Sequence, residues 1–160
     1  VGALADRFSG MQFISTFMPS IPQANIKEIG VVGHDRMKGL IQHACVYLAT
    51  TKETFGIGAL EALASGVPVL GFAHGGNLDT IKHRITGYLA KPGDYNDLAH
   101  GLEYCVKFRK DLSENAREDV KQWTWDKAVE KLADVYEKTF TIWKGKQRVL
   151  TLPQELYRVV

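Results

Sequence analysis

Short apolar runs alternate with polar, glycine-containing segments along the first half of the chain. Runs that are rich in Val, Ile, Leu and aromatic residues and bounded by Gly, Pro, Ser or Thr are typical of buried strands. The pattern predicts strands at residues 11–17, 26–32, 45–49, 67–73 and 86–90.

Longer segments with apolar residues three and four positions apart predict helices in the remaining chain. These segments are residues 1–10, 36–44, 57–65, 77–84, 95–108, 112–122 and 125–143. Asp35 is placed to N-cap the helix at 36–44, and Gly66 is placed to stop the helix at 57–65 in a left-handed conformation.

The strand at 45–49, the helix at 57–65 and the strand at 67–73 make a βαβ unit in the middle of the chain. Such a unit joins parallel neighbouring strands by a right-handed crossover. Strands and helices alternate along much of the chain, so the predicted fold class is α/β with a mainly parallel sheet.

The last predicted helix carries an apolar stripe at helical spacing, which begins at Trp123 and Trp125 and reaches Phe140. Such a stripe is more typical of a face packed on a core than of one bound to a membrane. No apolar run in the sequence approaches the length of a membrane span. Residues 144–160 are a C-terminal tail to which the pattern assigns no structure.

Composition narrows the class of protein only moderately. The 160 residues are enough for one domain with a sizeable core. The 45% hydrophobic and 24% charged residues are typical of globular proteins, and a net charge of +2 is too small to indicate a nucleic-acid partner. Cys45 and Cys105 are expected to be reduced and structural, as in a cytoplasmic protein.

The central βαβ unit carries the candidate chemistry. Glu61 is the only charged residue between Glu53 and His74, in a helix otherwise made of Ile, Gly, Ala, Leu and Ser. We expect this carboxylate to be buried, where it would need hydrogen-bond donors. Ligands of α/β sheets bind at the carboxyl ends of strands, so Glu53 and Glu61 are expected to face one crevice with helix-start amides between them. Carboxylates suit sugar hydroxyls and amides suit phosphate oxygens, which together predict a nucleotide sugar.

Other candidate sites are weaker. Residues 56–61 nearly match a dinucleotide-binding fingerprint but lack its third glycine, and no acidic residue ends a strand at the required distance. The histidines show no metal-ligand spacing. Gly75 and Gly76 follow a predicted strand and are expected to let the backbone approach a ligand closely.

Residues 53–69, ETFGIGALEALASGVPV, resemble the E-x7-E motif of retaining GT-B glycosyltransferases of family 4. The sequences HGGNLD at 74–79, TGYL at 86–89 and PGD at 92–94 are similar to the next landmarks of that family, in the same order. The resemblance covers roughly residues 28–138. It implies a Rossmann-like three-layer sandwich at residues 1–143, equivalent to the carboxyl-terminal, donor-binding half of a GT-B fold.

The resemblance also implies an activity. A retaining hexosyltransferase of this family moves a sugar from a UDP-, GDP- or ADP-linked donor to a glycan or lipid-linked acceptor, without a metal ion or other cofactor. The implied setting is polysaccharide biosynthesis in the cytoplasm, compatible with peripheral membrane association of the full-length enzyme. Two alternatives remain open, a non-catalytic nucleotide-sugar-binding module and a GT-B sugar-nucleotide epimerase.

Site residues follow from the same resemblance. Glu53 is expected to be the catalytic residue and to contact hydroxyls of the donor sugar, and Glu61 to contact the ribose. The implied donor-binding set is Glu53, Thr54, Phe55, Gly56, Ile57 and Glu61.

The implied nucleobase contacts are Val31, Val32 and Met37, and plain core packing is an equally good interpretation of Met37. The family's Arg and Lys-Gly pair, which clamps the diphosphate, is expected to precede Val1, together with an acceptor-binding amino-terminal domain. The chain, which begins Val-Gly-Ala, is therefore expected to be a fragment that is inactive alone.

Overall fold

The computed structural model describes residues 1–17 and 22–146. Contacts within the chain divide it into two compact units, Val1–Lys121 and Gln122–Val160, and each is described by itself. The boundary predicted at residue 143 concerns the extent of the donor-binding domain and stays a prediction. Of the predicted tail, residues 147–160 lie outside the described residues.

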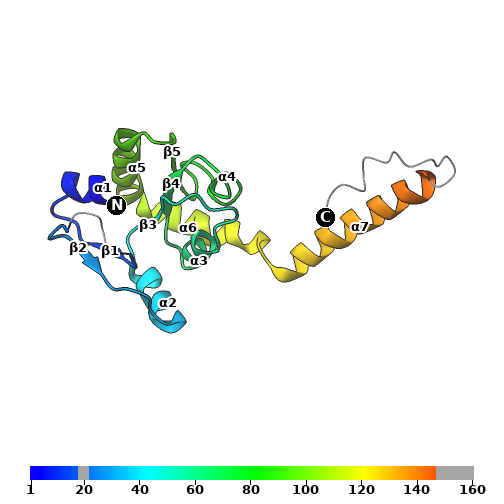
Figure 1. Ribbon diagram of the computed structural model, residues 1–160, viewed down its shortest axis with the longest axis horizontal. Coiled ribbons are helices and arrows are strands. Elements are labelled where there is room, and N and C mark those ends of the chain that lie inside the picture. The colour runs from blue at the N-terminus through cyan, green and yellow to red at the C-terminus, as the bar shows by residue number, and fades with distance from the viewer. Residues whose placement is uncertain (18–21, 147–160) are drawn as a thin grey trace. The chain divides into compact units, whose positions relative to one another are not determined.

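The first unit alternates strands and helices, as the apolar pattern predicts (Figure 1). Its strands are β1 Phe13–Ser15, β2 Ile26–Glu28, β3 Tyr47–Ala49, β4 Val69–Phe72 and β5 Gly87–Ala90. Its helices are α1 Gly2–Arg7, α2 His34–His43, α3 Ile57–Ala64, α4 Asn77–Thr80, α5 Tyr95–Lys107 and α6 Arg109–Asp119, and the 3-10 turn η1 Val120–Gln122 follows α6.

Among the described residues, all the strand pairs are parallel. The strands β1 and β2 form one small sheet, and β3, β4 and β5 form a second in that order. In the second sheet Ala49 pairs with Gly71, and Gly71 pairs with Leu89. The predicted βαβ unit is therefore confirmed, with β3 and β4 as parallel neighbours joined through α3. The strands are shorter than predicted, and β2 ends at Glu28 rather than at residue 32.

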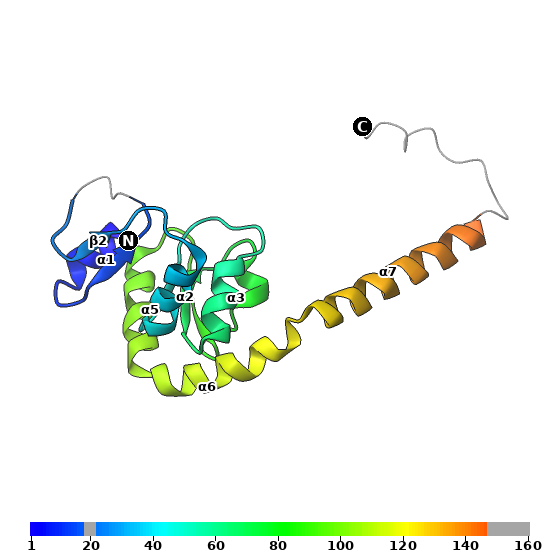
Figure 2. The ribbon, with the colours of Figure 1, turned by 90° about the horizontal axis from the view of Figure 1, so that it is seen from below.

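Alternate residues of the three-stranded sheet pack into two different cores. On β4, Leu70 belongs to the core that contains Leu98 of α5, whereas Val69 belongs to the core that contains Leu63 of α3. Figures 1 and 2 show α5 and α3 on opposite sides of this sheet. The result is a three-layer sandwich, and the predicted fold class is confirmed.

Helix ends agree only partly with the predictions. Gly66 has a φ of +72°, and its N–H donates to the carbonyl of Leu63, so the predicted left-handed stop of α3 is confirmed. Asp35 is not an N-cap, because α2 begins one residue earlier at His34 with Gly33 as its N-cap. Helix α4 ends at Thr80 instead of residue 84.

The described part of the second unit is dominated by α7, Trp125–Lys146. The large apolar residues of its stripe are exposed, with 87% exposure for Trp125 and 53% for Phe140. A single helix cannot bury its own apolar face, so the interpretation of this stripe as a core face stays a prediction. Among the described residues, no helix has the length and apolar character needed to cross a membrane.

Candidate functional site

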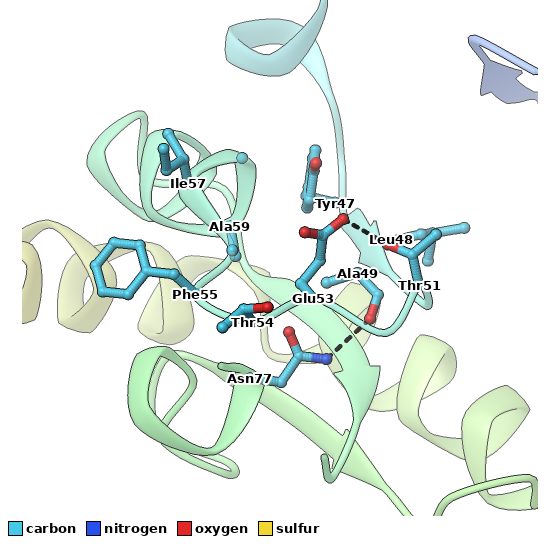
Figure 3. Close-up of a pocket in the computed structure, with 12 residues that line it drawn as sticks. Tyr47, Leu48, Ala49, Thr51, Glu53, Thr54, Phe55, Ile57, Ala59 and Asn77 are labelled. Atoms are coloured by element: carbon cyan, nitrogen blue, oxygen red, sulfur yellow. Dashed lines mark hydrogen bonds between the residues drawn. The ribbon is translucent and has the colours of Figure 1, made fainter. Parts of the chain in front are cut away.

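A cavity of about 330 Å³ opens where β3 ends (Figure 3). The residues that line it come from β3, from the loop after it, from the first turn of α3 and from the start of α4. Five of the six predicted donor-binding residues line the cavity: Glu53, Thr54, Phe55, Gly56 and Ile57. The carboxyl end of a strand in a parallel sheet is where α/β proteins bind ligands, and the volume suits a small organic molecule.

Glu53 projects from the loop that connects β3 to α3. Its side chain is exposed, and its Oε1 accepts a hydrogen bond of 3.1 Å from the hydroxyl of Thr51. Figure 3 shows the carboxylate turned toward Thr51 and Tyr47. An ionised carboxylate has about four lone-pair sites, so Glu53 retains acceptor capacity for hydroxyl groups of a ligand.

The first turn of α3 forms another wall of the cavity. The N-cap is Gly56, with a φ of +85°, and its carbonyl accepts the N–H of Ala59 at 3.0 Å. The N–H groups of the first helical residues precede the intrahelical hydrogen bonds and stand at the positive end of the helix dipole. Ile57 and Gly58 are such residues, and both line the cavity. This wall suits an anionic group.

Gly75 and Gly76, which follow β4, contact the backbone of the loop that carries Glu53. The N–H of Gly76 donates to the carbonyl of Glu53 at 3.0 Å. A methyl group on Gly76 would overlap the Phe55 carbonyl, and one on Gly75 would overlap the Glu53 carbonyl. Gly75 and Gly76 themselves do not line the cavity. The structure shows a close approach of these glycines to the loop, and the approach to a ligand predicted for them stays a prediction.

Glu61 is not buried, which corrects the expectation that singled it out. It is exposed and is not among the residues that line the cavity. The buried face of α3 is formed by Ala59, Ala62 and Leu63, whereas Ile57 and Glu61 are four residues apart on the exposed face. Because alanine and glycine give little contrast between the two faces, the sequence did not reveal which face was buried.

Tyr47 was missed by the sequence analysis, although it lines the cavity from β3. Its hydroxyl lies against Gly58, where an added methyl group would overlap it. Burial, then the negative charges of Glu61 and Glu53, raise the pKa of Tyr47 above its ordinary value of 10.0. The ring therefore lies within the field of both glutamates, and its hydroxyl stays protonated at neutral pH. Nothing in a short apolar strand distinguishes such a tyrosine from a core residue.

Asn77 was also missed. It is the first residue of α4, its side chain is 1% exposed, and it lines the cavity. Its Nδ2 donates to the carbonyl of Ala49 and to that of Phe72, each at 3.0 Å. These two carbonyls belong to the last residues of β3 and β4, so the amide ties together the two strand ends beneath the cavity. The sequence offered only a polar residue after two glycines.

The three residues predicted to touch a nucleobase do not line this cavity. Val31 and Val32 follow the end of β2, and Val31 is fully exposed. Met37 lies on α2 and packs against the core that contains Leu63. The core-packing interpretation of Met37 therefore describes its contacts, and the nucleobase role of the three residues stays a prediction.

The described residues contain no candidate site for a metal ion. Among them, no group of three or more His, Cys, Asp and Glu side chains is arranged to hold a metal ion. Cys105 is buried, burial raises its pKa to about 12, and Cys45 is a free thiol as well.

The three layers and the parallel strands define a Rossmann-like α/β class of domain. Residues 21–123 match the family described as glycosyl transferases group 1, which is more than half of the chain. The chain belongs to this family, and its fold is that of GT-B glycosyltransferases.

Relatives and solved structures agree with this assignment. An uncharacterized glycosyltransferase of Methanocaldococcus jannaschii is 33% identical over 114 residues, which cover 68% of this chain and 29% of that protein. Sucrose-phosphate synthase from Thermosynechococcus elongatus superposes with a TM-score of 0.63 at 28% identity, over 74% of this chain and 31% of that one. Anabaena HepE, solved in complex with UDP-glucose, gives a TM-score of 0.60 at 20% identity, over 72% of this chain and 33% of that one. The chain thus spans about a third of the length of each of these three proteins.

Proposed function

We propose that this chain provides the donor site of a retaining hexosyltransferase, which moves a sugar from a nucleotide diphosphate to a glycan or lipid-linked acceptor. The observation that carries the proposal is the cavity at the end of β3. It brings the carboxylate of Glu53 and the first amides of α3 to one open cavity. A nucleotide sugar needs this combination, since its hydroxyls donate hydrogen bonds and its diphosphate accepts them.

In this proposal the sugar lies beside Glu53. The carboxylate, already oriented by the hydroxyl of Thr51, accepts hydrogen bonds from sugar hydroxyls. Such charge-assisted bonds position the anomeric carbon for reaction. Glu53 is thereby the proposed catalytic residue, and it acts by binding and orientation rather than as a covalent nucleophile.

The diphosphate lies at the start of α3, near Gly56 and Ile57. Negative charge grows on the diphosphate as the glycosidic bond breaks, and the helix dipole and free N–H groups stabilise that charge. The acceptor hydroxyl then attacks the same face of the sugar that the diphosphate leaves, which gives retention. No metal ion is invoked, so addition of a chelator is expected to leave donor binding unchanged.

Glu61 is proposed to contact the ribose. It lies one helical turn beyond Ile57 on the same exposed face of α3, and four residues of helix advance about 6 Å. A nucleotide that extends from the cavity along this face would therefore pass Glu61. A uridine donor is the first to test, because Anabaena HepE, which shares the fold, was solved with UDP-glucose.

Calorimetric titration of the chain with UDP and UDP-glucose tests the proposal, and GDP-mannose and ADP-glucose extend the test to other bases. Glu53→Gln should weaken UDP-glucose binding about tenfold, equivalent to about 1.4 kcal/mol, and should change UDP binding little. Glu61→Gln should weaken both ligands, since both carry the ribose.

Glu103→Gln is the matched control, because Glu103 is exposed on α5 and does not line the cavity. It should bind both ligands as the unsubstituted chain does. If none of the four nucleotides binds, or if Glu53→Gln binds UDP-glucose normally, the proposed site is wrong.

A further inference from the structure

The side chain of Asn77 is held in one orientation. Both hydrogens of Nδ2 are directed to backbone carbonyls, those of Ala49 and Phe72 at 3.0 Å each. A flipped amide would place Oδ1 against two carbonyl oxygens, which repel it. The amide therefore has no free donor, and Oδ1 is its only remaining polar group.

That oxygen is buried and has no hydrogen-bond partner among the residues described. Figure 3 shows Nδ2 directed to Ala49 and Oδ1 on the other side of the amide, toward Thr54. Asn77 is 1% exposed and lines the cavity, so bulk solvent does not compensate the oxygen. A buried acceptor without a partner is destabilising, and a ligand that supplies a donor removes this cost.

We infer that Asn77 is a specificity-determining residue, whose Oδ1 accepts a hydrogen bond from one hydroxyl of the donor sugar. The inference rests on the proposed function and deepens it. Because Oδ1 can only accept, it favours a hydroxyl or N–H group and repels a phosphate oxygen. The acceptors Glu53 and Asn77 thus mark the sugar end of the cavity, and the amides of α3 mark the phosphate end. This polarity fixes the direction in which a nucleotide sugar lies.

The test uses the unsubstituted chain, because Asn77 also ties β3 to β4 and its variants would be destabilised. The NMR chemical shift of the Asn77 Cγ carbon is measured with UDP, with UDP-glucose and with the monodeoxy analogues of UDP-glucose. The shift should move with UDP-glucose and not with UDP. One monodeoxy analogue should fail to move it and should bind about tenfold more weakly, equivalent to about 1.4 kcal/mol.

Asn25 is the internal control. Its Nδ2 also donates to backbone carbonyls, including those of Ala5 and Phe8, but it does not line the cavity. Its Cγ shift should stay constant throughout the titration.

The outcomes separate this inference from the proposed function. If backbone amides of residues 56–58 respond to UDP-glucose but the Asn77 Cγ does not, the inference is overturned while the donor site stands. An equal Cγ response to UDP alone also overturns it. If neither the amides nor the Cγ respond to any of these nucleotides, the proposed function itself fails.

Discussion

At the scale of single residues, the site depends on a close contact between two pieces of backbone. Gly76 donates its N–H to the carbonyl of Glu53 and leaves no room for a side chain beside the Phe55 carbonyl. The loop that carries Glu53 is therefore held by a backbone contact with Gly76, and a larger residue at position 76 could not make the same contact. The position of the proposed catalytic carboxylate follows from this contact.

Gly76→Ala should disturb this loop. The added methyl group would overlap backbone atoms of Phe55, which cannot move as a flexible side chain can. We expect a loss of about 1–3 kcal/mol in the free energy of unfolding, measured by urea denaturation. UDP-glucose affinity should fall in the same variant.

Gly39→Ala is the matched control for this substitution. Gly39 lies inside α2, and its added methyl group would meet nothing within 4 Å. Replacing a helical glycine with alanine should stabilise the fold by about 0.5–1 kcal/mol. Equal effects of the two substitutions would contradict the account of the loop support.

At this scale the loop and helix start that form much of the cavity were predictable from sequence, because Glu53 to Ile57 stand in one local segment. The rest of the site was not predictable, and the nucleotide sugar that the spacing of the glutamates indicated stays a prediction. Tyr47 and Asn77 enter the cavity from other elements, and only the pairing of β3 with β4 brings them together. Glu61 was misjudged because its helix offers little contrast between buried and exposed faces.

At the scale of elements, the start of α5 is held by two carboxylates. Asp94 is the N-cap, and its Oδ1 accepts the N–H groups of Asn96 and Asp97 at 3.0 Å each. Asp97 in turn accepts the N–H of Lys91 and the hydroxyl of Tyr88, each at 2.8 Å. These bonds connect α5 to β5 and to the residue that follows it.

Asp94→Ala should cost about 1 kcal/mol of stability, because it removes the acceptor for two helix-start N–H groups. Thermal unfolding monitored by circular dichroism measures the loss. Asp35→Ala is the control, since Asp35 lies in the first turn of α2, where no side chain caps the helix. A similar loss in both variants would show that the cap is not the cause.

Asp97 should make the stability of the fold depend on pH in the acid range. The hydrogen bond from the Lys91 N–H is the main cause that lowers the pKa of Asp97 below its ordinary value of 3.8. The unfolded chain therefore binds the proton more readily, so this stabilisation is complete above that ordinary value and is lost as the pH falls through the folded pKa.

Asp97→Asn should cost about 1.5 kcal/mol at neutral pH, and the difference from the unsubstituted chain should shrink in acid. Urea denaturation of both proteins at a series of pH values measures this difference in the free energy of unfolding. Asp111→Asn, at an exposed position in the first turn of α6, should stay within about 0.5 kcal/mol of the unsubstituted chain. A pH-independent difference for Asp97→Asn would contradict the assignment.

The order and type of the elements were predictable, because apolar runs and helical spacing are local properties. The residues at which strands and helices end were harder to predict. The predicted strand at 26–32 continues through Ile29, Val31 and Val32, yet β2 stops at Glu28, since its pairing with β1 extends only from Phe13 to Ser15. Helix α4 is shorter than its pattern suggests, and Arg84 beyond it has a φ of +62°, outside helical geometry.

At the scale of the whole molecule, the first unit places its candidate site at one edge of a parallel sheet covered on both faces. Side chains of β4 alternate between the core under α5 and the core under α3. This arrangement fixes the end of β3 against the start of α3, where the cavity forms. The fold follows from this architecture, and in the proposed function the few residues that line the cavity select the donor sugar.

The most direct test of the account is an NMR titration of the backbone amides with UDP-glucose. The largest shift changes should occur at residues 47–59 and at Asn77, with the amides of Ile57 and Gly58 among them. UDP alone should perturb the start of α3 but leave Asn77 nearly unchanged. Shift changes concentrated elsewhere, or no response at millimolar UDP-glucose, would contradict the assignment of this cavity as the donor site.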